Sequence, residues 1–129
     1  MLAKDIMTRE VTTVKPELTI HELAKTFAQH HISGAPVVDE NGKVTGVVSD
    51  GDILSKKGEC VSSLMSKPLI FVTEDVPVEK IADLMIANKI KRVPVLSEEK
   101  LVGIVSRADI IRAIAMGQHI AMHSPIYDL

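Results

Sequence analysis

The stretch Gly46–Ile53 reads Gly-Val-Val-Ser-Asp-Gly-Asp-Ile, and it returns at Gly103–Ile110 as Gly-Ile-Val-Ser-Arg-Ala-Asp-Ile. The β-branched pair in each copy predicts the end of a buried strand. The serine that follows can cap a helix, because its hydroxyl accepts from the free N–H groups of the first turn. The aspartate three residues later lies in that turn, where a carboxylate suits the helix dipole. One copy could be a capped helix and nothing more, but the return of both serine and aspartate favours a function.

The rest of the chain is duplicated around this motif. One constant shift places Pro36-Val37 on Pro94-Val95, and a shift shorter by one residue places the first motif on the second. Such repetition decides the architecture. We expect an α+β fold of two pseudo-symmetric β-α-β-β-α repeats, with small sheets packed against helices. Repeat one should span 1–58 and repeat two 59–117, followed by a tail at 118–129. Packed by pseudo-two-fold symmetry, the repeats should form two clefts, one at each motif.

Periodicity and turn signals predict the elements of each repeat. Thr19 and Glu22 form a capping box before the first long helix, and Asn41-Gly42 is a hairpin turn. In repeat one we expect strands at 11–14, 35–38 and 44–48, and helices at 20–30 and 49–57. In repeat two we expect strands at 69–72, 93–96 and 101–105, helices at 78–88 and 106–116, and a short helical turn at 61–65.

Composition narrows the class of protein. The chain has 129 residues, 46% hydrophobic content and a net charge of −2, as suits one compact soluble domain. Aromatic residues make up only 2%, and the charge balance is near neutral, so we expect no nucleic-acid partner. A single cysteine, Cys60, fits a reducing compartment. No signal peptide or long apolar run is present, so we expect a cytoplasmic protein without a membrane partner.

On these residues the chain resembles a tandem pair of cystathionine-β-synthase (CBS) domains, also called a Bateman module. The resemblance covers roughly residues 1–117 and rests on the two motifs, on Ile32–Asp39 with its partner Ile90–Leu96, and on the paired repeat length. It implies a regulatory, non-catalytic module that binds AMP, ADP, ATP or S-adenosylmethionine. No catalytic, kinase or transporter sequence accompanies the repeats, so we expect a stand-alone pair. The alternative is a scaffold with vacant clefts that dimerises or holds a partner protein.

The resemblance also implies which residues bind the ligand. The family's aspartate binds the ribose hydroxyls and its serine contacts ribose or phosphate, roles that carry over to Ser49 with Asp52 and to Ser106 with Asp109. An ionised carboxylate can accept from both hydroxyls of a diol, and such charge-assisted bonds are strong. The adenine slot points to further candidates: Thr13, Val14, Ile32, Ser33, Gly34, Ala35 and Pro36 in repeat one, and Phe71, Val72, Ile90, Lys91, Arg92, Val93 and Pro94 in repeat two.

Basic residues suggest where a phosphate would bind. His30 and His31 either contact phosphate or lie favourably at a helix C-terminus. Lys89, Lys91, Arg92 and Arg107 form either a solvated face or a phosphate cradle, and Arg107 beside Ser106 favours the cradle. We therefore expect the Ser106/Asp109 cleft to hold the phosphate-bearing nucleotide. The Ser49/Asp52 cleft, where Asp50 opposes a phosphate, should be empty, weaker, or occupied by a ligand without terminal phosphates.

Other chemistry finds little support in the sequence. His119 and His123 are four residues apart, but no third ligand accompanies them, so we expect no metal site. Cys60 has no activating histidine beside it, and no nucleophile–base pair is recognisable, so we expect no enzyme. The resemblance implies a homodimer formed through helices, with candidate apolar surface at Leu23, Phe27, Leu84, Met85, Ile111 and Ile114.

Overall fold

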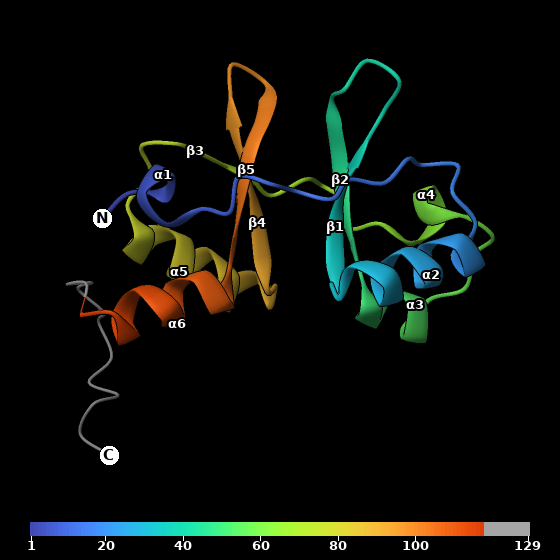
Figure 1. The fold of residues 1–129 in the computed structure, drawn as a ribbon. Helices are drawn as coiled ribbons and strands as arrows, with labels where there is room; N and C mark the ends of the chain where they lie inside the picture. The colour runs from blue at the N-terminus through green and yellow to red at the C-terminus, as the bar shows by residue number, and fades with distance from the viewer. Residues whose placement is uncertain (118–129) are drawn as a thin grey trace.

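Two antiparallel hairpins stand side by side in the middle of the molecule, and helices flank each of them (Figure 1). The computed structural model describes residues 1–117. The first lobe contains α2 (Ile20–His30), β1 (Gly34–Val38), β2 (Val44–Ser49) and α3 (Asp50–Ser55). The second lobe repeats this order with α5 (Val78–Asn88), β4 (Arg92–Ser97), β5 (Lys100–Ser106) and α6 (Arg107–Ala115). The helix, hairpin and helix expected in each repeat are therefore confirmed.

The two hairpins are paired in matching registers. Gly34 lies opposite Ser49 in the first hairpin, and Arg92 lies opposite Ser106 in the second. The motif serine thus ends one strand of each hairpin, opposite the first residue of the other strand. Gly42, in the turn of the first hairpin, has a φ of +79°, a left-handed conformation that glycine adopts without steric cost.

The ends of the long helices follow from local chemistry. Thr19 Oγ1 accepts from the N–H of Glu22 at 3.2 Å, and the Glu22 carboxylate accepts from the N–H of Thr19 at 3.1 Å, so the predicted capping box is confirmed. At their C-termini, α2 is capped by His31 and α5 by Lys89, both with a φ of 54°. These two residues hold equivalent left-handed caps in the two repeats.

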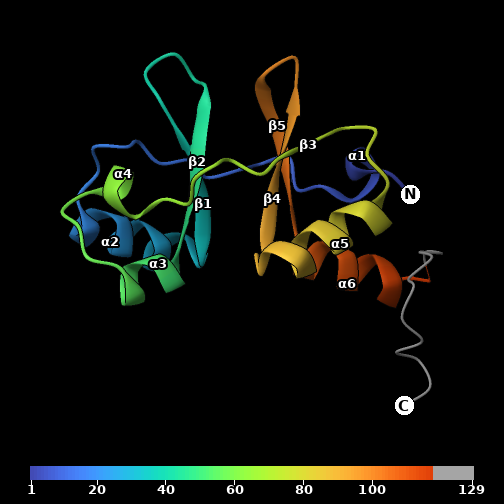
Figure 2. The same cartoon turned by 180° about the vertical axis from the view of Figure 1, so that it is seen from behind.

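The segment that leads into each repeat packs on the opposite lobe, as the crossing chains of Figure 2 show from behind. The helix α1 (Ala3–Ile6), which the sequence analysis did not predict, joins the core of the second lobe, and the N–H of Ala3 donates to the carbonyl of Val76 at 2.9 Å. In return α4 (Val61–Leu64) joins the core of the first lobe, where the N–H of Val61 donates to the carbonyl of Leu18 at 2.9 Å. Each lobe is therefore completed by the other repeat's leading segment.

Some predicted strands are shorter than expected. Of the strand predicted at 11–14, only Val14 pairs, with β1, while 69–72 is reduced to β3 (Val72–Thr73), which runs parallel to β4. The reason is that the preceding residues are used in crossing between the lobes. Helix α3 ends at Ser55, short of the predicted 57, because the backbone of Lys56 is already extended.

Only part of the apolar surface proposed for dimerisation is exposed. Leu23, Phe27 and Met85 are buried in the two cores, so the expectation is wrong for these three, and Leu84 and Ile114 are partly buried. Ile111 is 62% exposed, as that expectation requires, and the helices also expose Ile86 (66%). No helix in the described part of the chain is long and apolar enough to cross a membrane.

Candidate functional site

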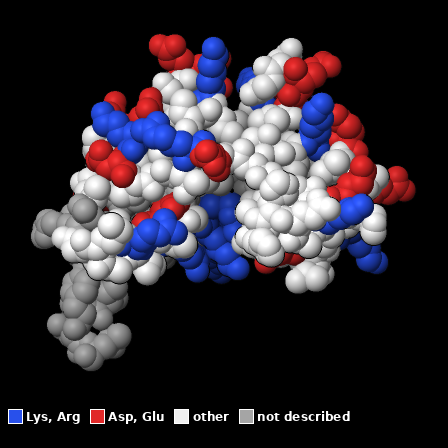
Figure 3. Space-filling model, viewed as in Figure 1, with Lys and Arg blue, Asp and Glu red and all other residues white. Residues whose placement is uncertain are grey.

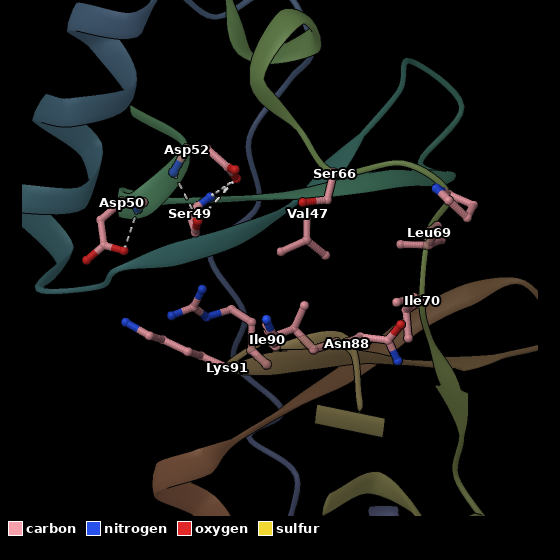
Figure 4. A pocket seen from close by; sticks show the side chains of 14 residues that line it. Val47, Ser49, Asp50, Asp52, Ser66, Leu69, Ile70, Asn88, Ile90 and Lys91 are labelled. Atoms are coloured by element: carbon pink, nitrogen blue, oxygen red, sulfur yellow. Dashed lines mark hydrogen bonds between the residues drawn. The ribbon is translucent and has the colours of Figure 1, made fainter. Parts of the chain in front are cut away.

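Two clefts lie at the junction of the lobes, one at the N-terminal end of α3 and the other at that of α6. Their volumes, about 330 and 440 Å³, are those of small-molecule pockets, which span about 300–1,000 Å³. The α3 cleft (Figure 4) is lined by Val47, Ser49, Asp50, Gly51, Asp52, Ser66, Pro68, Leu69, Ile70, Asn88, Lys89, Ile90, Lys91 and Arg92. The α6 cleft is lined by Thr8, Glu10, Val11, Thr12, His31, Ile32, Ser33, Gly34, Lys91, Arg92, Ile104, Ser106, Arg107, Ala108 and Asp109.

Each cleft combines the motif of one repeat with loops of the other. Ser49 and Asp52 face the connector and the segment before Pro94 from repeat two, whereas Ser106 and Asp109 face their counterparts from repeat one. This arrangement corrects the expected placement of the basic residues. Lys89 lines the α3 cleft and not the Ser106/Asp109 cleft, and His31 lines the α6 cleft and not the Ser49/Asp52 cleft. The cause is the pseudo-two-fold packing, which brings the ends of opposite repeats together.

Asp52 is held in a capping box but keeps one oxygen almost free. Its Oδ2 accepts from the N–H of Ser49 at 2.8 Å and from the Ser49 hydroxyl at 3.1 Å. Ser49 Oγ in turn accepts from the N–H of Asp52 at 3.3 Å. Within residues 1–117, Asp52 Oδ1 has one partner, the ammonium of Lys56 at 2.8 Å. Asp52 lines the cleft (Figure 4), and a carboxylate oxygen has room for a second donor, so Oδ1 is the candidate acceptor for a ligand.

Asp109 repeats the box but is more fully engaged. Its Oδ2 accepts from the N–H and hydroxyl of Ser106 at 2.8 and 3.1 Å. Its Oδ1 accepts from the hydroxyl of Thr8 at 3.0 Å and from Arg112 Nη1 at 3.0 Å. Asp109 is 4% exposed, compared with 8% for Asp52, so both carboxylates are largely covered. A ligand diol would have to displace Thr8 or Arg112 to reach this carboxylate.

Basic side chains gather in the hollow between the lobes, as the space-filling view shows (Figure 3). In the α3 cleft, Lys89, Lys91 and Arg92 line the wall that faces Asp50 and Asp52. Such an arrangement offers a carboxylate acceptor on one side and three cations on the other. It can therefore accept hydrogen bonds from hydroxyls and bind an anionic group of the same ligand.

Arg92 belongs to both clefts. Its Nη2 crosses to the other repeat and donates to Ser33 Oγ at 2.6 Å. Burial lowers the pKa of the Arg92 guanidinium from its ordinary value, while the carboxylates of Asp50 and Asp52 oppose that shift. The group remains charged, since an arginine is not deprotonated in proteins.

Several residues predicted for the adenine slot lie elsewhere. Ala35, Pro36, Val93 and Pro94 are buried in strands, and Val14 and Val72 belong to the cores. Phe71, 47% exposed, lines a separate apolar groove, and Thr13 lines neither cleft. His30, which was a candidate phosphate ligand, also lines neither cleft. The clefts are lined instead by connector residues that were not predicted from the sequence, Glu10, Val11 and Thr12 in one connector and Leu69 and Ile70 in the other. Comparing equivalent positions of the two repeats could have identified the connectors as cleft segments. It does not show which residues of an extended connector face the cleft.

Two further observations concern metal ligands and the single cysteine. Within residues 1–117, no three histidine, cysteine, aspartate or glutamate side chains come together as a metal site requires. His119 and His123 lie outside those residues. Cys60 Sγ is 3.1 Å from Ser62 Oγ, and hydrogen bonds from Ser62 and Ser63 lower the pKa of this thiol.

Comparison with known proteins identifies relatives over almost all of the described chain. The CBS domain model matches twice, at residues 3–59 and 61–116. The CBS domain-containing protein YhcV of Bacillus subtilis is 36% identical over 114 residues, which cover 83% of this chain and 81% of that protein. The inosine-5′-monophosphate dehydrogenase of Methanocaldococcus jannaschii is 33% identical over 85% of this chain. This chain spans only 23% of the length of that dehydrogenase.

Solved structures share the fold. The CBS domain pair of protein MJ0100, in complex with 5′-methylthioadenosine and S-adenosyl-L-methionine, is 33% identical, with a TM-score of 0.84. The match covers 92% of this chain and 98% of that one. CBSX2, a protein of Arabidopsis thaliana whose structure was solved in complex with AMP, is 28% identical with a TM-score of 0.82, covering 89% of this chain and 96% of that one.

Proposed function

The chain belongs to the CBS-domain family as a tandem pair, and we propose that it is a regulatory module that senses an adenosine-containing nucleotide of the AMP, ADP or ATP class. The observation that carries the proposal is the α3 cleft, whose lining brings together the carboxylate of Asp52 and three basic residues. The relatives solved with AMP and with S-adenosyl-L-methionine support the same class of ligand. S-adenosylmethionine is the alternative ligand.

The α3 cleft offers a suitable group for each part of a nucleotide. Asp52 Oδ1 accepts from a ribose hydroxyl, beside the capping hydroxyl of Ser49. Ile70 and Ile90 are half-buried lining residues whose apolar surface covers the adenine. The cations of the opposite wall, Lys89 above all because it lines this cleft alone, bind the phosphate.

The positions of the charged residues favour a phosphate in the α3 cleft, whereas the sequence predicted the phosphate in the α6 cleft. In the α6 cleft, Arg107 remains a candidate phosphate ligand, but Asp109 is already bound by Thr8 and Arg112. In the α3 cleft, Asp50 still repels a phosphate, but Lys89, Lys91 and Arg92 offset it. We therefore propose the α3 cleft as the tighter site for a phosphate-bearing nucleotide, and the α6 cleft as the weaker one.

Calorimetric titration of AMP, ADP, ATP and S-adenosylmethionine into the purified chain tests this function. Asp52→Asn should weaken the tighter binding event by about 10- to 100-fold, the loss of one hydrogen bond to a charged acceptor. Asp109→Asn is the matched control from the other repeat and should leave that event nearly unchanged. The absence of any heat or stabilisation with all four ligands would reject the sensing function.

The protein partner of such a module is a second copy of the chain or a regulated protein, and we propose a homodimer in the cytoplasm. The exposed Ile86 and Ile111 on α5 and α6 favour an assembly through helices. We assign no catalysis to the pair, because relatives that are enzymes, such as the dehydrogenase, extend far beyond the matched region. Light scattering of the wild-type chain and of Ile111→Glu should give a dimer and a monomer; a monomeric wild type at micromolar concentration would exclude the homodimer.

A further inference from the structure

Arg92 and Gly34 occupy equivalent positions in the two repeats, but one carries a long cationic side chain and the other carries none. Each is the first residue of its hairpin and lies opposite the serine of its own motif, Gly34 opposite Ser49 and Arg92 opposite Ser106. The pseudo-two-fold packing brings the two positions together at the boundary between the clefts, because Arg92 lines both clefts and Gly34 lines one of them.

The Arg92 guanidinium fills the space that a side chain at position 34 would need. A methyl group added to Gly34 would collide with Arg92 Nη1 and Cζ and would lie 2.8 Å from Nε. The neighbouring Ser33 holds the guanidinium there, since its Oγ accepts from Arg92 Nη2 at 2.6 Å. The boundary between the clefts thus has room for one arginine where strict symmetry would place two.

This single cation is shared between the two sites. On the side of the α3 cleft, the negative charges of Asp50 and Asp52 stabilise the charged guanidinium of Arg92 from a distance. Within residues 1–117, neither carboxylate lies within ion-pair distance of it. On the side of the α6 cleft it is hydrogen-bonded to Ser33. A planar guanidinium binds a phosphate best with two parallel N–H bonds from one edge. Because Arg92 Nη2 is already bound to Ser33 on the α6 side, both edges that include Nη2 become available to a phosphate in the α3 cleft only when that bond is released.

We infer that Arg92 couples the two clefts, so that a phosphate-bearing ligand in one cleft weakens the binding of a second in the other. The inference rests on the proposed function and adds a regulatory property to it. A phosphate in the α3 cleft draws the guanidinium away from Ser33 and leaves the α6 cleft with less positive charge. The coupling is reciprocal, as any linkage between binding equilibria must be. A ligand without phosphate does not bind the Arg92 guanidinium, so its binding in one cleft does not affect its binding in the other.

Nuclear magnetic resonance titration separates the two sites, because the amides of Gly51 and Ala108 line the α3 and α6 clefts respectively. The affinity of AMP for the α6 cleft is measured in the wild type, where the α3 cleft fills first, and in Asp52→Asn, where AMP binding in the α3 cleft is weakened and no longer precedes binding in the α6 cleft. We expect that affinity to be about tenfold higher in Asp52→Asn, the effect of one charge-assisted bond no longer contested. With adenosine the two proteins should not differ. If the Ala108 amide responds first, the same comparison is made with Asp109→Asn and the Gly51 amide.

Two variants test whether Arg92 is responsible. Arg92→Gln and Gly34→Ala should each abolish the tenfold difference, the first by removing the cation and the second by displacing it while keeping the charge. Lys89→Gln is the matched control, since Lys89 lines only the α3 cleft, and it should weaken AMP there and retain the coupling. AMP binding in both clefts with no coupling in the wild type, or coupling that persists in both variants, would overturn the inference alone. The absence of AMP from both clefts would overturn the proposed function and the inference together.

Discussion

Asp109→Ala should destabilise the protein considerably more than Asp52→Ala, although the two residues are equivalent in the repeats. Both variants lose the carboxylate that accepts from the N–H of the capping serine. Only Asp109 also binds the hydroxyl of Thr8, at 3.0 Å, and thereby fastens the N-terminal segment to α6. The wild-type carboxylate is 4% exposed, so its partners cannot simply turn to water when it is removed.

The expected magnitudes follow from these contacts. Loss of the reciprocal capping bond costs about 1 kcal/mol in either variant. The bond between Thr8 and a buried carboxylate adds about 1.5–3 kcal/mol to the cost of Asp109→Ala. The ion pair with Arg112 adds little, because the arginine side chain is 62% exposed. Asp109→Ala should therefore lower the free energy of unfolding by about 2.5–4 kcal/mol, and Asp52→Ala by about 1 kcal/mol.

Urea unfolding followed by far-ultraviolet circular dichroism measures both losses under the same conditions. Thr8→Val, alone and combined with Asp109→Ala, completes a double-mutant cycle that should return a coupling energy of about 1–2 kcal/mol. Equal losses in the two alanine variants, or strictly additive effects of Thr8→Val and Asp109→Ala, would refute the reasoning.

Three further predictions concern packing, pH and ligand selectivity. Gly103→Ala should lower the free energy of unfolding by about 1–3 kcal/mol in thermal melts, because the added methyl group would lie 2.6 Å from Met7 Sδ; a stability equal to wild type would contradict this. Hydrogen bonds from Thr19 hold the pKa of Glu22 below its ordinary value. This carboxylate therefore stabilises the fold above its unfolded-state pKa, and the contribution is lost as the pH falls through its folded-state pKa. Glu22→Gln should lose less stability on acidification, measured by circular dichroism, and a pH profile identical to wild type would argue against this. Lys89→Gln should lower the affinity for AMP by about tenfold in calorimetry and leave the affinity for adenosine nearly unchanged. An equal loss of affinity for both ligands would show that Lys89 does not bind the phosphate.

Local signals allowed most of the fold to be predicted. The capping boxes that begin α2, α3 and α6 depend on residues three positions apart, and the hairpin turn depends on Asn41-Gly42, so one short window holds each signal. Helix α1 was missed because its four residues are too few for a periodic pattern, and it is stabilised by packing against the second lobe.

The composition of the clefts could be predicted only in part. The motif residues Ser49, Asp52, Ser106 and Asp109 line them as the duplication suggests. Lys89, in contrast, was assigned to the motif of its own repeat and lies in the cleft of the other. That pairing is a property of the packing between lobes, which leaves no trace in the spacing of residues along either repeat.

The most direct test of the account is a crystal structure of the chain grown with saturating AMP. We predict that the ribose lies in the α3 cleft, with a hydroxyl donating to Asp52 Oδ1, and that the phosphate lies against Lys89 or Arg92. AMP density beside Ser106 and Asp109 alone, with the α3 cleft vacant, would contradict the central claim.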